Sequence, residues 1–123
     1  MATWYENAGN PAIQTIHADV IAAPVTIGAS NATQNIDFST AQIFPFTVTS
    51  NATFTVTNAT PGQMVTLVLT QGASAQGTGT FPSTWKFPGA TKTLSSTASY
   101  VDTVNAKCIN GGLFLCTIAL AYA

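Results

Sequence analysis

The stretch Thr53-Phe-Thr-Val-Thr57 shows the pattern that decides the fold class of this chain. Its threonines alternate strictly with apolar residues, so an extended strand would place Phe54 and Val56 on one face and the threonines on the other. One face would be buried while the other meets solvent. The stretch therefore predicts a half-buried β-strand.

Similar patterns predict strands at residues 43–48 and 64–70. The first of these contains Pro45, whose missing N–H confines the strand to a sheet edge or to an irregular start. A short run at residues 84–87 lies between two prolines and predicts a brief strand. The turn Thr60-Pro-Gly62 has proline and glycine at the positions that turn chemistry favours.

Two long β-prone segments, residues 98–109 and 113–122, flank Asn110-Gly-Gly112. Asn-Gly and Gly-Gly are typical of hairpin turns, so these segments predict an antiparallel pair. Seven or eight short strands with frequent turns then occupy residues 34–123. We expect an all-β domain, an antiparallel sandwich or barrel.

The first 33 residues have a different character, without strong core-forming runs. Aromatic side chains stand near the start, where they are best accommodated if something covers them. We expect residues 1–33 to form an extended N-terminal arm that lies on a neighbouring protein, with residues 34–123 as the β-domain. An ordinary first strand packed on its own domain is the alternative. The candidate partner-binding residues are Trp4, Tyr5, Ile13, Ile16, Val20 and Ile21.

Charged residues make up only 6% of the chain, against about 25% in ordinary soluble domains. Three lysines, four acids and the single His17 are scattered along it, and the net charge is −1. So few ionisable groups, scattered along the chain, favour a structural or binding protein over an enzyme. They predict no cofactor and no metal site. The scarcity of charge predicts a surface that other protein covers.

The same composition disfavours two classes of partner. Phosphate contacts need clustered basic residues, so we expect no nucleic-acid binding. No apolar stretch approaches the roughly 20 residues of a membrane span, and the start of the chain does not resemble a secretory signal. We therefore expect Cys108 and Cys116 to be reduced packing residues rather than a disulfide.

The tripeptide Asn-Ala-Thr occurs at residues 31–33, 51–53 and 58–60. Each copy formally matches a glycosylation acceptor. Without a secretion signal, we interpret the copies as turn-forming asparagine followed by β-prone threonine.

The second half of the chain has a characteristic order of elements. An apolar strand ending in glutamine leads to a Gly-rich loop, a Trp-x-Phe-Pro-Gly strand, an aspartate-containing strand, a hairpin and a final apolar strand. The positions that carry this order are Leu67, Leu69, Gln71, Trp85, Pro88, Gly89, Leu94, Asp102, Gly111 and Gly112. Over about residues 37–122 it resembles the C-terminal β-sandwich domain of tailed-phage fibre and virion proteins. The resemblance implies a jelly-roll-like antiparallel β-sandwich.

Members of that family serve in receptor contact, fibre tips and capsid-surface knobs. Here no fibre shaft, heptad repeat or tail-docking segment accompanies the domain, so we expect a capsid cement or decoration protein of a tailed bacteriophage. It would be made in the bacterial host cytoplasm, bind the phage major capsid protein and stabilise the shell at the virion surface. We expect a homotrimer, with a homodimer as the alternative.

The main alternative function is a tail-fibre, receptor-binding or glycan-binding knob. Trp85 could then stack on a sugar, although a tryptophan in a short strand between prolines more often packs in its own core. A glycan-degrading enzyme is disfavoured, because the four acids give no evident carboxylate pair.

Overall fold

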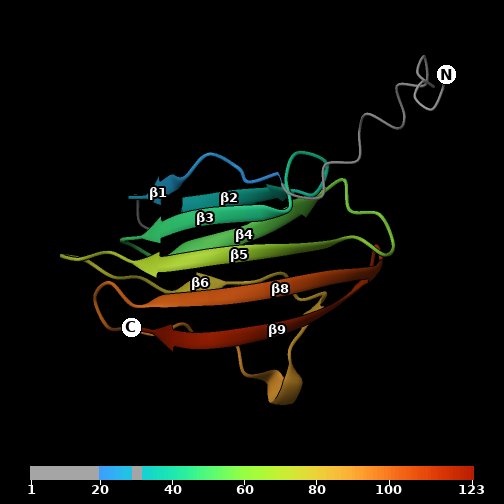
Figure 1. The fold of residues 1–123 in the computed structure, drawn as a ribbon. Coiled ribbons are helices and arrows are strands. Elements are labelled where there is room, and N and C mark those ends of the chain that lie inside the picture. The colour runs from blue at the N-terminus through green and yellow to red at the C-terminus, as the bar shows by residue number, and fades with distance from the viewer. Residues whose placement is uncertain (1–19, 29–31) are drawn as a thin grey trace, which may run out of the picture.

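The computed structural model describes residues 20–28 and 32–123 and consists mainly of strands (Figure 1). The all-β prediction is confirmed. A single turn of 3-10 helix lies at Pro88–Ala90, and no helix in the described part of the chain is long and apolar enough to cross a membrane. The strands are β1 (Val25–Ile27), β2 (Ala32–Asp37), β3 (Ile43–Val48), β4 (Ala52–Thr57), β5 (Met64–Gln71), β6 (Gly79–Thr80), β7 (Trp85–Lys86), β8 (Val101–Asn110) and β9 (Leu113–Tyr122).

The strands form two sheets. A six-stranded sheet has the order β1-β3-β5-β8-β9-β7, and a three-stranded sheet has the order β2-β4-β6. From β1 to β6 the chain passes from one sheet to the other at every link, so each strand lies beside the strand two places earlier. The hairpin β8–β9 then extends the larger sheet (Figure 1).

The predicted antiparallel arrangement is wrong for most of the molecule. Five strand pairs are parallel, and only β5–β8 and β8–β9 are antiparallel. The link at residues 49–51 carries the chain from β3 in one sheet across to β4 in the opposite sheet. The apolar faces of β3 and β4 therefore meet through the core, where the rings of Phe46 and Phe54 lie 5.5 Å apart in an edge-to-face contact.

Pro45 does not lie on an edge strand, because β3 runs between β1 and β5. The N–H of Ala22 donates to the carbonyl of Ile43, so residues 43, 45 and 47 direct their backbone groups towards the β1 side. On that side the chain is not a strand between Ala22 and Pro24. The missing N–H of Pro45 therefore faces a gap in the neighbouring strand and interrupts no regular ladder.

Two predicted turns are confirmed. The β8–β9 hairpin closes at residues 111–112, where the N–H of Gly112 donates to Oδ1 of Asn110 at 2.8 Å. In the second turn Gly62 has a φ of 92°, a conformation that glycine adopts without strain, and the N–H of Gln63 donates to the carbonyl of Thr60 at 3.0 Å.

The repeated Asn-Ala-Thr tripeptides have a structural meaning that the sequence interpretation missed. Ala32 and Thr33 on β2 pair in parallel register with Ala52 and Thr53 on β4. The separation of 20 residues between these copies is thus one circuit around the two sheets. Side chains continue the pairing further along, since the hydroxyl of Thr55 donates to Oδ1 of Asn35 at 3.0 Å.

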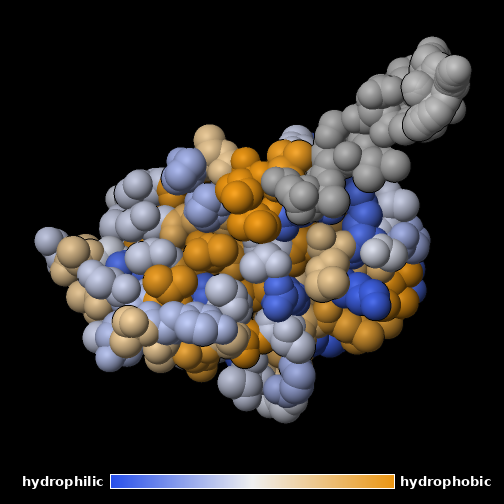
Figure 2. All heavy atoms as spheres, in the orientation of Figure 1, coloured by the Kyte–Doolittle hydropathy of each residue, from blue (hydrophilic) through white to orange (hydrophobic). Residues whose placement is uncertain are grey.

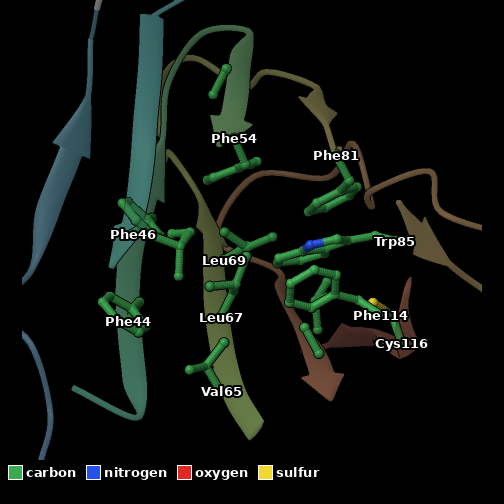
Figure 3. Close-up of a cluster of buried hydrophobic side chains, with 14 of the residues drawn as sticks. Phe44, Phe46, Phe54, Val65, Leu67, Leu69, Phe81, Trp85, Phe114 and Cys116 are labelled. Carbon is green, nitrogen blue, oxygen red and sulfur yellow. The ribbon is translucent and has the colours of Figure 1, made fainter. Parts of the chain in front are cut away.

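The core is rich in stacked aromatic rings (Figure 3). Phe81 stacks on Phe54 with centroids 5.3 Å apart and on Trp85 with centroids 5.8 Å apart. Trp85 also lies 6.0 Å from Phe114 on β9. These contacts join the three-stranded sheet to the far side of the six-stranded sheet, so the loop after β6 completes the core.

Two buried polar side chains hold the chain before β6 and the chain between β7 and β8 in place. Gln71 donates from Nε2 to the carbonyls of Gly77 and Ser95, at 2.8 and 2.7 Å, and accepts from the N–H of Gly77. Asp102 accepts from the N–H and hydroxyl of Ser95, at 2.6 and 2.7 Å, and from the N–H of Ala121. Both side chains are about as buried as the apolar core, and their bonds satisfy them there.

Candidate interaction surface

Of the candidate partner-binding residues, Trp4, Tyr5, Ile13 and Ile16 lie outside the described residues. Val20 and Ile21 lie along β3 at the edge of the six-stranded sheet. The carbonyl of Val20 accepts from the N–H of Gln42 at 2.9 Å, and Ile21 forms a parallel bridge with Ile43. Val20 packs partly against the core, whereas Ile21 is 61% exposed and free to contact a partner.

The expected boundary between arm and domain at residue 33 falls inside β2. The preceding strand β1 pairs with β3, and its Ile27 is fully buried in the core. Residues 25–27 therefore belong to the sheet. The arm that the sequence predicts is limited to the chain before this strand.

Trp85 does not present a ring to a ligand. It is 2% exposed and lies against the rings of Phe81 and Phe114. The indole Nε1 is buried and has no hydrogen-bond partner among the described residues. The glycan contact considered for Trp85 is therefore unavailable in this structure, and its place in the core agrees with the alternative given above.

The broadest exposed feature is the side of the six-stranded sheet that faces away from the core, which we call the outer face. Alternation along the strands places one set of side chains there, mostly apolar residues and threonines. Lys86 and Lys107 are the charged members of this set. The outer face consists of Thr26, Ile43, Pro45, Thr47, Met64, Thr66, Val68, Thr70, Lys86, Val101, Thr103, Asn105, Lys107, Leu115, Thr117 and Ala119.

Strand register organises the outer face into rows. Thr26, Thr47 and Thr70 lie side by side on β1, β3 and β5. In another row the hydroxyl of Thr66 donates to Oδ1 of Asn105 at 2.6 Å. The polar groups of the outer face are thus mainly hydroxyls and amides rather than charged groups. Apolar patches, orange in Figure 2, lie among weakly polar residues, which are pale. The sequence of each strand shows this alternation by itself. Only the order of the strands in the sheet shows that the alternating side chains form one continuous surface.

A hollow of about 760 Å³ opens on this sheet near the start of β5. Its polar lining includes the amides of Gln42, Gln63 and Asn105 and the hydroxyl of Thr66. Oε1 of Gln42 is buried without a hydrogen-bond partner among the described residues. The remaining lining is largely apolar, with Phe38, Ile43, Met64 and Val65.

The described acids serve the fold. Asp37 accepts from the hydroxyl and the N–H of Ser39, at 2.6 and 2.9 Å, and from Nδ2 of Asn58 at 3.0 Å. The hydrogen bond from the Ser39 hydroxyl, followed by those from Asn58 and the Ser39 N–H, lowers the pKa of this carboxyl below 3.8. Asp37 therefore closes the turn after β2 as a carboxylate.

The thiols of Cys108 and Cys116 are free and buried on neighbouring strands. Burial raises the pKa of both, and that of Cys116 to about 12, because a desolvated thiolate is unfavourable. Neither thiol has the environment of a nucleophile. No group of three or more His, Cys, Asp or Glu side chains within residues 20–28 and 32–123 is arranged to hold a metal ion.

Comparisons of the chain with protein-family models, curated proteins and solved structures found no match. The function is therefore argued from the outer face, the edge at which the chain enters the sheet, and the resemblance described above.

Proposed function

We propose that this chain is a structural virion protein of a tailed bacteriophage, a cement or decoration protein that binds the major capsid protein and stabilises the shell. It acts at the capsid surface after synthesis in the bacterial host cytoplasm. The partners are the capsid protein and further copies of the chain, as a homotrimer or a homodimer. No catalytic step belongs to this function.

The observation that carries the proposal is the nearly uncharged outer face. A broad sheet surface of threonines and apolar residues with only Lys86 and Lys107 charged is costly to leave in water, and it suits burial against another protein. Many copies, each contributing a modest interface, would together resist the pressure of packed DNA.

The entry of the chain into the domain supports the same partner. Ile21 and Val25 are 61% and 40% exposed at the edge strand beside β3. Segments that leave a sheet edge in this way can add a strand to a neighbouring protein. An arm and the outer face together would let one copy contact two neighbouring capsid subunits.

The family relation is also part of the proposal. Two sheets around one core and a closing β8–β9 hairpin support a sandwich related to the phage domains. The five parallel strand pairs depart from the antiparallel order of a jelly roll. The relation therefore rests on the shared core and the hairpin.

The test is binding of the purified protein to expanded, undecorated capsid shells. Thr103→Glu places a charge in the middle of the outer face and should weaken binding at least tenfold. Thr80→Glu, an exposed threonine on the three-stranded sheet, should bind like the unaltered protein. Equal binding by both variants would exclude the outer face as the contact.

The hollow at the start of β5 favours a second function, binding of a glycan receptor. Amides and a hydroxyl without charge can exchange hydrogen bonds with sugar hydroxyls. The lining also contains the Gln42 acceptor, which has no partner among the described residues. A glycan screen tests this function. Binding that is lost in Asn105→Ala would support it, whereas no bound glycan would leave the capsid partner as the sole proposal.

A further inference from the structure

Among the described strands, none pairs with most of one edge of the six-stranded sheet. β9 runs from Leu113 to Tyr122 beside β8, but on its other side β7 pairs only with Phe114 and Leu115. No other described strand lies along that side of residues 116–122. We call this side of residues 116–122 the free lane, and Figure 1 shows β9 as the outermost long strand.

Backbone groups in the free lane are available for pairing. The N–H of Phe114 points away from β8, because it donates to the carbonyl of Thr84. Backbone groups alternate sides along a strand, so Ile118 and Leu120 direct their N–H and C=O groups into the lane. The N–H of Ala121 points the other way and donates to Asp102, which agrees with this alternation.

The lane lacks most of the usual protection of an edge strand. Its one irregularity is a bulge near the end, where Ala121 has a φ of 62° and the pairing with β8 shifts between Ala119 and Tyr122. Natural edges carry lysine, proline or inward-pointing charges that prevent pairing with other chains. Residues 113–122 contain no charged residue and no proline. Leu115, Leu120 and Tyr122 are 51%, 43% and 56% exposed. An edge of this length and composition is suited to pairing with another strand.

We propose that the occupant of the free lane is the same lane of a second copy, in an antiparallel pair across a two-fold axis. Two-fold symmetry closes such a pair, so no third copy can add to it. The two lanes overlap fully when the axis passes through the middle of the lane, at Ala119. Each Ile118 then lies opposite Leu120 of the second copy. These two residues direct their N–H and C=O groups into the lane, and both have apolar side chains.

This register sets how far the pairing between the two copies extends. With Ala119 at the axis, the regular pairing joins Ile118 to Leu120 of the second copy and stops at the bulge, because Tyr122 is again in register with Val101 of its own β8. The absence of charge in the lane also allows self-pairing, because two identical charged strands would bring like charges together. Neither Pro88 nor the exposed Lys86 lies within the paired residues.

A hollow provides an anchor at each end. About 420 Å³ of mainly apolar space is lined by Lys86, Phe87, Pro88, Leu115, Cys116 and Thr117. Tyr122 of the second copy follows directly after the paired residues on the side of this hollow, and a tyrosine in a pocket is a common anchor of interfaces. The two-fold pair therefore uses the exposed Tyr122 and fills a space beside β7.

This contact does not depend on binding to a capsid. It selects the homodimer over the homotrimer. Because specific, stable interfaces bury at least about 1,200 Å² in total, a dimer built on one added strand should be weak. We expect a dimer that dissociates on dilution.

The first test is sedimentation of the full chain over a wide range of concentrations. Leu120→Lys introduces a charge beside the axis and should weaken dimer formation at least tenfold, about 1.4 kcal/mol. Met64→Lys makes the same change at a side chain of similar exposure two strands away, and should leave the dimer unchanged. A protein that is monomeric throughout would overturn the proposal.

The second test fixes the register by cross-linking. The backbone groups of Ala119 face β8, so the two copies of this residue form a non-hydrogen-bonded pair with Cα atoms about 4.5 Å apart, within disulfide range. Ala119→Cys should form a disulfide-linked dimer under mild oxidation. Thr117→Cys should not, because the two copies would lie about 13 Å apart along the strands.

Other occupants give different results. If residues 1–19 of the chain filled the lane, Ala119→Cys would stay monomeric after oxidation. If copies met through another surface, a dimer would form without this cross-link and would be insensitive to Leu120→Lys. Either result would contradict the pairing.

Discussion

Asp102 joins the chain before β8 to the end of β9. Its buried carboxyl group accepts hydrogen bonds from the N–H and hydroxyl of Ser95 and from the N–H of Ala121. Asp102→Ala would leave these donors without a partner in the interior. We expect a loss of about 3 kcal/mol in the free energy of unfolding, measured by denaturant titration. Asp102→Asn keeps one acceptor oxygen and should lose less, and a variant with Ala that is as stable as the unaltered protein would contradict this role.

Asp37 should make stability depend on acid pH. Hydrogen bonds from Ser39 and Asn58 lower its pKa in the folded protein, so the folded state holds the carboxylate better than the unfolded chain does. This contribution is present above the unfolded pKa of about 3.9 and is lost as the pH falls through the lower folded value. Asp37→Asn should therefore be less stable than the unaltered protein at pH 7, and the difference should shrink towards pH 2.5. A difference that does not change with pH would exclude the effect.

At the scale of elements, the link before β6 lies very close to the link before β4. A Cβ atom added at Gly77 would overlap the backbone of Ser50, which cannot move as a side chain could. The N–H of Gly77 also donates to Gln71. Gly77→Ala should thus lower the free energy of unfolding by about 1–3 kcal/mol, as overpacking does.

Gly111→Ala is the matched control for this change. Gly111 lies in the β8–β9 turn, where an added Cβ would meet nothing within 4 Å. Thermal unfolding of the two variants compares them directly. Equal melting temperatures would show that the two links are not packed as described.

Strand positions were predictable from the sequence, but strand partners were not. Alternation located β3, β4 and β5 because burial of one face depends only on local order. Whether two neighbouring strands run parallel or antiparallel depends on where each connecting link leads. The link at residues 49–51 has the composition of a hairpin turn, yet it crosses to the other sheet. The repeat of Asn-Ala-Thr at a separation of 20 residues was the available signal for parallel circuits.

The candidate surface was predictable only in part. Low charge indicated that other protein covers this chain, and Val20 and Ile21 do lie at a sheet edge. The outer face could not be found from single strands, because its rows join residues as distant as Thr26 and Thr70. The free lane of β9 likewise depends on the two-residue length of β7.

At the scale of the whole molecule, the two surfaces have separate roles. The outer face lies over the broad side of the larger sheet, whereas the free lane is at its edge. A dimer formed through the lanes would leave most of both outer faces exposed. Each dimer could then hold two capsid subunits with faces of the same composition.

The measurement that tests the central claim most directly is the number of copies bound to expanded, undecorated capsid shells at saturation, counted per major capsid protein after co-sedimentation. The proposed function predicts saturable binding at a fixed stoichiometric ratio. No binding, or only a few copies per particle, would contradict a cement role.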